Sequence, residues 1–200
     1  ATLARIEKLN PKFNAFRLVD AEKALADAKA SEERWIKREP AGLVDGVPST
    51  IKDLVDTKGW STRRGSLTTS DVGTWENDAP LVARLRENGA VLLGKTTTPE
   101  FGWKGVTDSP LTGITRNPWN PEKTPGGSSG GAAAAAAACL GALHHGSDGG
   151  GSIRMPSGYT GIYGLKPTFG RVPTWPASGF GTLSHQGPMT RTVNDAALML

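Results

Sequence analysis

Residues 124–152 form an almost uncharged stretch in which Asp148 is the single charged side chain. Within it, the run GGSSGG (residues 126–131) leads directly into seven alanines, residues 132–138. Alanine is the strongest helix former, and its small side chain lets a helix pack closely against its neighbours. A Gly/Ser run is typical of a flexible linker, but an uncharged, alanine-rich helix following it argues against one. The sequence therefore predicts a helix buried at the centre of the molecule and bordered by glycine-rich loops.

Hydrophobic periodicity and turn residues outline the other elements. Asp20 is placed to cap a helix over residues 21–39, which Pro40 ends, with Ala24, Leu25 and Trp35 on its apolar face. A second helix is predicted over residues 79–88, directly before a continuous apolar strand at 90–95. Short strands are expected at 46–53 and 162–165, a short extended segment over 10–20, a loop over 107–125 and a capped helix start at Thr192. A helix that leads into a buried strand is half of a βαβ unit, so we expect an α/β fold with a central mixed β-sheet flanked by α-helices.

Composition excludes several classes of protein. With 37% hydrophobic residues among 200, the chain can bury a sizeable core and is not globally disordered. No uncharged apolar run is long enough to span a membrane, so we expect no membrane contact. A single cysteine, Cys139, excludes a disulfide framework and a thiolate-only metal site. Sparing use of cysteine is typical of a reducing compartment, and we expect a cytoplasmic protein.

The net charge of +4 does not indicate nucleic-acid binding. A nucleic-acid-binding protein usually gathers its lysines and arginines into a patch. Here the basic residues are spread along the chain, and the only adjacent pairs are Lys37-Arg38 and Arg63-Arg64. We interpret the charge as solvation of the surface and expect no nucleic-acid partner.

Two serines flanked by glycine require an explanation. Ser128 lies in GGSSGG, and Ser152 follows a second run, Gly149-Gly150-Gly151. Glycine is entropically unfavourable to order, but it permits close approach to a ligand or a row of backbone N–H groups directed at a developing oxyanion. Neither run has the spacing of a phosphate-binding P-loop or a dinucleotide fingerprint, and Ser152 lacks the Gly-x-Ser-x-Gly elbow of many hydrolases. Nucleophilic serine chemistry is the interpretation that remains.

A nucleophilic serine needs a base, and the sequence offers two kinds. Histidine is the usual base, and the chain has His144, His145 and His185. Adjacent histidines point in different directions and no third ligand accompanies them, so we interpret His144 and His145 as structural and assign no metal. Lys52 is the alternative, because it ends the apolar segment 47–51 and burial would keep its amine neutral. Taken alone, Lys52 would also fit a surface lysine at a strand end.

Several ordered motifs make the chain resemble the amidase signature family. They are GVPSTIKD (residues 46–53), GGSSGG (126–131) and DGGGSIRMP (148–156). Three further segments match the style of that family: LGKTTTPEF (93–101), TRNPWN (115–120) and GLKPT (164–168). The resemblance covers nearly the whole chain and is thinnest before residue 40.

The resemblance implies a Ser–cis-Ser–Lys triad. Carried over position by position, Ser152 is the nucleophile, Ser128 is the bridging serine on a cis peptide, and Lys52 is the base. The backbone N–H groups of Gly149, Gly150, Gly151 and Ser152 resemble the family's oxyanion hole. The residues that resemble supports of the site are Ser129, Asp148 and Arg154.

The resemblance also implies an activity. A member of the family would be an amidohydrolase that cleaves a carboxylic amide to an acid and ammonia or an amine through a serine acyl-enzyme. It would act on a small-molecule amide without a metal or organic cofactor, and assembly as a homodimer is left open. A non-catalytic relative that keeps the fold is a further hypothesis, against which the presence of all three triad residues argues.

The alternative within the family is the A subunit of a tRNA-dependent glutamine amidotransferase, which would bring a tRNA as partner. Met155 stands where those subunits usually carry glutamine, which disfavours this alternative. Gly149 is a second departure, because many relatives carry threonine or isoleucine there.

The resemblance divides the chain into two parts. We expect residues 1–40 to form an N-terminal helical segment, and residues 41–200 to form the N-terminal part of the amidase signature domain, whose C-terminal part is absent. The apolar helical pattern at 196–200 carries no stop signal, which predicts a fragment. Such a piece alone is expected to expose a sheet edge and apolar surface, and to be poorly soluble or inactive.

Overall fold

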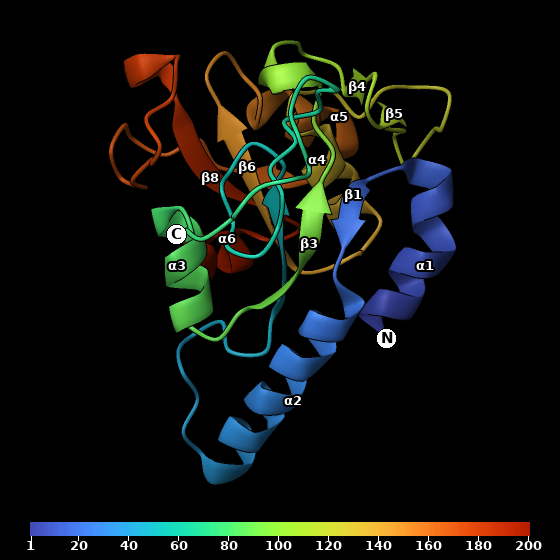
Figure 1. Ribbon diagram of the computed structural model, residues 1–200. Coiled ribbons are helices and arrows are strands. Elements are labelled where there is room, and N and C mark those ends of the chain that lie inside the picture. Colours follow the sequence, from blue (N-terminus) through green and yellow to red (C-terminus); the bar gives the residue numbers. More distant parts are fainter.

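The computed structural model describes residues 1–200 and is built around a six-stranded mixed sheet (Figure 1). Its strands are β1 (Phe16–Val19), β2 (Pro48–Lys52), β3 (Val91–Thr96), β6 (Leu143–Asp148), β7 (Tyr163–Gly164) and β8 (His185–Thr190). They lie in the order β1-β3-β2-β6-β8-β7. β2 pairs in parallel with both β3 and β6, whereas the pairs β1–β3, β6–β8 and β7–β8 are antiparallel. A separate small hairpin joins β4 (Asp108–Ser109) to β5 (Gly113–Ile114).

Helices cover both faces of this sheet. They are α1 (Thr2–Phe13), α2 (Ala21–Lys37), α3 (Pro80–Glu87), α4 (Gly130–Ala137), α5 (Arg154–Thr160) and α6 (Val193–Met199), with short 3₁₀ turns at Glu100–Gly102 and Gly181–Leu183. One core cluster packs α1 and α4 against β3, and the other packs α3 against β2, β3 and β6 on the opposite face. The predicted α/β fold, with a mixed sheet between helices, is confirmed.

The alanine run forms the central helix of the molecule, as predicted. Ala132 to Ala136 are all at most 1% exposed, so every side of α4 is covered. The helix contacts α5 and four strands of the sheet, β2, β3, β6 and β8. At its start, a Cβ on Gly131 would lie 2.4 Å from the backbone nitrogen of Thr97. Small side chains are therefore what allows this helix to pack so close to the sheet.

The sequence prediction for residues 10–20 was wrong in part. The extended piece is limited to β1, because α1 continues through Asn10 and Pro11 to Phe13. The Asn10 side-chain oxygen accepts hydrogen bonds from the backbone N–H groups of Ala15 and Phe16, at 2.8 and 2.9 Å. This side chain ends the helix and turns the chain into β1.

The helix that Asp20 caps was predicted correctly, but its apolar face was not. The Asp20 carboxylate accepts from the backbone N–H of Lys23, and the helix ends at Lys37. Leu25 and Trp35 remain 62% and 55% exposed. Figure 1 shows the reason, because α2 projects away from the sheet and only its first turns lie beside the core.

The remaining predicted elements are confirmed with small shifts, but four strands were missed: β6, β8 and the hairpin β4–β5, which lies in the loop predicted over 107–125. The segments 46–53, 79–88 and 162–165 contain β2, α3 and β7, the segment 90–95 overlaps β3, and Thr192 caps α6 through its side chain. β6 and β8 carry no alternating pattern, and β8 contains Pro188, a residue that rarely lies in the interior of a sheet. The expected boundary at residue 40 stays a prediction, although Ile6 and Phe13 share a core cluster with Ala134.

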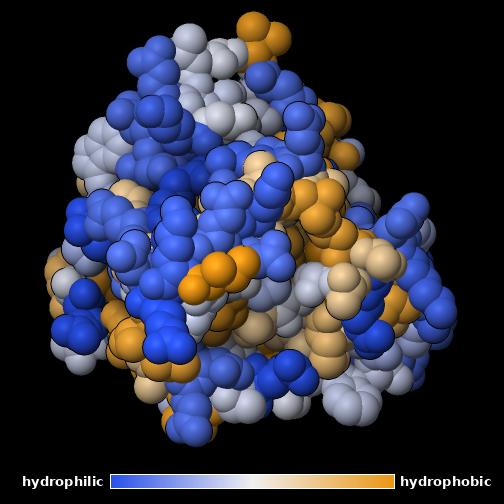
Figure 2. All heavy atoms as spheres, turned by 90° about the horizontal axis from the view of Figure 1, so that it is seen from below, coloured by the Kyte–Doolittle hydropathy of each residue, from blue (hydrophilic) through white to orange (hydrophobic).

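None of the helices combines the length and the apolarity needed to cross a membrane. Seen from below, the surface is mostly hydrophilic and is interrupted by separate apolar patches (Figure 2).

Candidate active site

The candidate site lies where the parallel strands β2 and β6 end. Lys52 is the last residue of β2, and Asp148 is the last residue of β6. Because these strands are parallel neighbours, their carboxyl ends meet at one edge of the sheet. Ligands of open α/β sheets bind at that edge. Two chain segments far apart in sequence therefore deliver their polar side chains to one place.

The Lys52 ammonium group is completely buried and surrounded by serine hydroxyls. Its Nζ lies 2.7 Å from Ser128 Oγ, 2.8 Å from Ser129 Oγ and 2.9 Å from Ser147 Oγ. Sequence reasoning singled out the first two of these serines and missed Ser147. The available signal was its place next to Asp148, at the end of an uncharged segment that leads into the second glycine run.

Burial determines the charge state of this lysine. Burial lowers the pKa of Lys52 to about 7, and the negative charge of Asp148 opposes that shift. A buried ammonium is disfavoured because hydroxyl groups replace water poorly as its solvent. At neutral pH a substantial share of Lys52 is therefore the free amine, which can accept a proton.

The first glycine run places two serines at the start of α4. The peptide bond between Gly127 and Ser128 is cis, as the family resemblance implies. The backbone N–H of Ser129 donates to the carbonyl oxygen of Ser152, at 3.2 Å. This bond ties the start of α4 to the second glycine run, so that Ser128 and Ser152 line the same cavity, of about 650 Å³. In the structure Ser152 is partly exposed and its hydroxyl forms no hydrogen bond within the protein.

Asp148 organises the loop that carries Ser152. Its Oδ1 accepts from the Gly151 N–H at 2.7 Å, and its Oδ2 accepts from the Ile153 N–H at 3.1 Å. The Arg154 guanidinium binds both carboxylate oxygens, at 2.9 and 3.0 Å. Burial raises the pKa of Asp148, but the Arg154 side chain and these N–H groups outweigh it and hold the pKa at about 2. Asp148 and Arg154, two of the expected supports of the site, thus pair with each other.

The second glycine run offers three free backbone donors rather than four. The N–H of Gly151 is engaged by Asp148, which corrects the expectation that it faces a substrate oxygen. The N–H groups of Gly149, Gly150 and Ser152 form no hydrogen bond within the protein. These three donors are available to an oxyanion.

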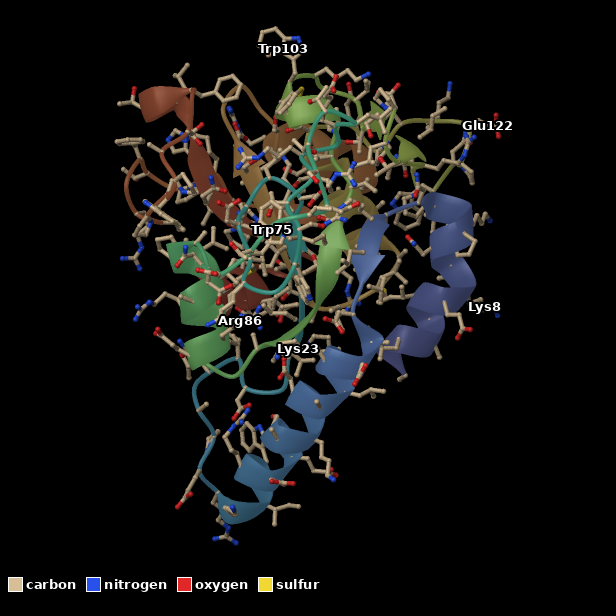
Figure 3. The ribbon with its side chains drawn as sticks, viewed as in Figure 1. Lys8, Lys23, Trp75, Arg86, Trp103 and Glu122 are labelled. Atoms are coloured by element: carbon tan, nitrogen blue, oxygen red, sulfur yellow. The ribbon has the colours of Figure 1, made fainter.

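Aromatic and charged side chains share the wall of the cavity. The aromatic residues are Phe101, Trp103, Trp175 and Phe180. Trp103 projects from the end of the molecule in Figure 3 and is 78% exposed. An ion pair between Arg64 and Asp56, at 3.5 Å, lies on the same wall. The chain therefore provides both apolar surface and charge around the serines.

The histidines are not placed as bases. His144 Nδ1 lies 2.9 Å from Thr50 Oγ1, and His145 Nε2 lies 2.8 Å from Gln186 Oε1. Burial lowers the pKa of His144 to about 4 and that of His145 to about 3, so both rings are neutral at pH 7. His185 packs edge-on against Phe169. Neither member of the pair bonds a serine, which agrees with a structural interpretation.

Comparison with known proteins assigns the family. The family model described as Amidase matches residues 1–200. The chain belongs to the amidase family. This confirms the family resemblance that the motifs indicated.

The amidase chain is similar to enzymes with different names. It is 42% identical to an indoleacetamide hydrolase of Bradyrhizobium diazoefficiens over 207 residues, covering 100% of this chain and 39% of that protein. It is 46% identical to the glutamyl-tRNA(Gln) amidotransferase A subunit of Methylococcus capsulatus over 202 residues, covering 100% of this chain and 41% of that protein. A crystal structure of a bacterial aryl acylamidase of the amidase signature enzymes superimposes with a TM-score of 0.91 at 37% identity, covering 99% of this chain and 42% of that one. The chain thus spans about two fifths of the length of these relatives.

Proposed function

We propose that this chain carries the catalytic centre of an amidohydrolase, with Ser152 as nucleophile, Ser128 as proton relay and Lys52 as base. The observation that carries the proposal is the buried Lys52 amine, 2.7 Å from Ser128 Oγ in a cavity that Ser152 also lines. A serine hydroxyl becomes a useful nucleophile when a neighbouring base takes its proton. A lysine with its pKa lowered to about 7 is such a base at neutral pH.

In the first half-reaction, Ser152 Oγ forms a bond to the amide carbonyl carbon. Its proton passes to Ser128 Oγ while the Ser128 proton moves to the Lys52 amine. The carbonyl oxygen becomes an oxyanion, which the N–H groups of Gly149, Gly150 and Ser152 stabilise; one donor of this kind contributes about 3–4 kcal/mol. The C–N bond then breaks, and the proton returns from Lys52 through Ser128 to the leaving nitrogen.

The second half-reaction frees the enzyme. Water takes the place of the amine and attacks the acyl-enzyme, with its proton passing to Lys52 by the same route. The bond between the acyl carbon and Ser152 Oγ breaks, and Ser152 recovers its proton. The products are a carboxylic acid and ammonia or an amine, and no step requires a metal or an organic cofactor.

The same site supports a second candidate function, the A subunit of a glutamine amidotransferase. The 46% identity to the Methylococcus capsulatus protein favours it, and that reaction would also begin with attack of a serine on an amide. The two functions differ in the amide that is used. Rapid release of ammonia from glutamine, dependent on partner subunits, would support the amidotransferase, whereas hydrolysis of other amides by this protein alone would support the amidohydrolase.

A small-molecule amide remains our proposed substrate class, and a cytoplasmic location and a homodimer remain predictions. The location rests on the single cysteine, Cys139, which is typical of a reducing compartment.

A fluorophosphonate that traps activated serines tests the proposed triad. We expect the full protein to form one adduct, on Ser152, as mass spectrometry of peptides would show. Its rate of formation should rise with pH through about 7, because the neutral form of Lys52 is the active base. Lys52→Ala and Lys52→Arg should each slow labelling by about 10²–10⁴-fold, because neither side chain can accept the proton.

The matched control is Lys23→Ala, which removes an exposed lysine of α2 whose ammonium pairs with Asp27. It should label like the wild type. No adduct, an adduct on another residue, or unchanged labelling of both Lys52 variants would contradict the proposed triad.

A further inference from the structure

A second lysine, Lys95 in β3, is completely buried but has no part in the proposed chemistry. Its Nζ donates to the carbonyl oxygen of Val55 at 2.5 Å and to Thr62 Oγ1 at 2.9 Å. It also lies 3.9 Å from Asp53 Oδ1. A buried amine is strongly disfavoured unless polar partners form hydrogen bonds with it. Several partners do so here, and all of them belong to the segment that follows Lys52.

A bulge in β3 turns Lys95 toward that segment. The preceding residues Val91 and Leu93 face the cluster that contains α1 and α4. Regular alternation would place Lys95 on the same face. Gly94 interrupts the alternation with a φ of 150°, and a Cβ there would lie 2.0 Å from the Leu18 carbonyl oxygen. The irregular pairing with β1 and β2 agrees with such a bulge, and Lys95 emerges beside Val55 on the opposite face.

Asp53 joins Lys95 to the residue that follows the proposed base. This carboxylate is 1% exposed and pairs with Arg17 at 2.8 Å. It also accepts from the Arg63 N–H at 3.3 Å. Asp53 is adjacent to Lys52 in the chain, and its own N–H donates to the Thr96 carbonyl oxygen. Cationic and N–H groups from separate segments thus converge on the residue next to Lys52.

The same contacts hold the turn that leaves β2. The Lys52 carbonyl oxygen accepts from the N–H groups of Leu54 and Val55, at 2.8 and 3.2 Å. Lys95 Nζ donates to the carbonyl oxygen of Val55, so it connects the end of this turn to β3. Further along, Arg64 N–H donates to the Asp53 carbonyl oxygen. Leu54, Val55 and Arg64 all line the cavity that holds Ser128 and Ser152.

We propose that Lys95, paired with Asp53, is a positioning residue that holds the turn after β2 and thereby places the Lys52 amine against Ser128. The inference rests on the proposed function, because Lys95 can position Lys52 for catalysis only if Lys52 is the base. Lys95 acts on Lys52 through the contacts of this turn and touches no reacting atom. Under the alternative, Lys95 has a structural function alone. A methionine of similar length would then replace it with little loss or a gain in the free energy of unfolding.

The test compares two substrates that share an acyl group, the anilide and the phenyl ester of hexanoic acid, on the full protein. An amide nitrogen must receive a proton before it leaves, whereas a phenoxide leaves without one. A misplaced Lys52 therefore slows the anilide more than the ester. Loss of folded protein slows both equally, so the ratio of the two kcat values is insensitive to stability.

We expect Lys95→Met to lower kcat for the anilide at least tenfold more than kcat for the ester, with both KM values within twofold of wild type. The variant Lys95→Met/Asp53→Asn, which leaves no unpaired buried carboxylate, should show the same change in ratio. Lys23→Met is the matched control and should keep the wild-type ratio. Wild-type ratios in both Lys95 variants would overturn the inference.

Lys52→Ala separates this inference from the proposed function. If Lys52→Ala abolishes anilide hydrolysis while the Lys95 variants keep the wild-type ratio, only the positioning function is overturned. If Lys52→Ala leaves anilide hydrolysis intact, the proposed function fails, and the inference fails with it because Lys52 then has no task.

Discussion

At the scale of single residues, one carboxylate shapes the loop that carries the proposed nucleophile. Asp148 is buried, and its pKa of about 2 keeps it ionised at neutral pH. Its two oxygens accept hydrogen bonds from the loop's own backbone and from Arg154. The N–H of Gly151 is engaged by this carboxylate, whereas those of Gly149 and Gly150 form no hydrogen bond within the protein. A negative charge beside Lys52 also keeps the pKa of that lysine from falling further.

Asp148→Asn should loosen this loop without removing a side chain. An amide has one acceptor oxygen, so its NH₂ group would face N–H donors that the carboxylate now satisfies. We expect the free energy of unfolding to fall by about 1–3 kcal/mol and fluorophosphonate labelling to slow at least tenfold. Chemical denaturation and labelling kinetics measure the two effects.

The control for this substitution is Asp27→Asn on the surface of α2, where the ion pair with Lys23 is exposed. It should change stability by no more than about 0.5 kcal/mol. Equal behaviour of the two variants would contradict an organising function for Asp148.

At the scale of elements, α4 is limited by the space around it. Its alanines are buried among α1, α5 and four strands of the sheet. Helix propensity alone would accept leucine at these positions nearly as well as alanine. Packing does not, because the helix axis lies too close to its neighbours for longer side chains.

Ala134→Leu should therefore destabilise the protein by about 1–3 kcal/mol, because three extra carbon atoms must displace the surrounding core. Ala28→Leu on the exposed side of α2 introduces the same atoms into solvent and should be nearly neutral. Urea denaturation of both variants measures the two changes in the free energy of unfolding. A neutral Ala134→Leu would mean that α4 has free space beside it.

At the scale of the whole molecule, two buried lysines make stability depend on pH. Burial lowers the pKa of both Lys52 and Lys95 from the usual 10.5 to about 7, and Asp148 and Asp53 respectively oppose these shifts. Between pH 7 and about 10.5 the unfolded chain holds protons that the folded protein has released. Stability therefore falls as pH falls from about 10.5 to 7, and below that range these lysines add no further pH dependence.

The free energy of unfolding of the full protein should accordingly rise from pH 7 to pH 9, with each lysine contributing up to about 1.4 kcal/mol per pH unit. The variant Lys52→Met/Lys95→Met lacks both groups and should show a flatter dependence. Guanidinium denaturation at pH 7, 8 and 9 measures the difference. Parallel curves for wild type and variant would mean that the two lysines remain charged when the protein folds.

Local features of the sequence predicted much of the fold, and their failures have physical causes. The buried α4, the β2–α3–β3 unit and the cap at Asp20 depend on neighbouring residues and were found. The strand β8 was missed because Gly187 and Pro188 are residues that rarely lie within a strand. Only pairing with β6 and β7 makes this segment a strand. The apolar face of α2 was misjudged because amphipathic spacing identifies a face but not a partner to cover it.

The sequence by itself determined the family, the α/β class and the residues proposed for catalysis, because glycine runs and motif spacing are local and specific. Tertiary structure alone decided the rest. It brought Ser147 to Lys52, engaged Gly151 with Asp148, and turned Lys95 toward Val55. Strand order and a bulge create these contacts between residues distant in sequence. The charge state of a lysine depends on the water excluded around it, which no run of neighbouring residues specifies.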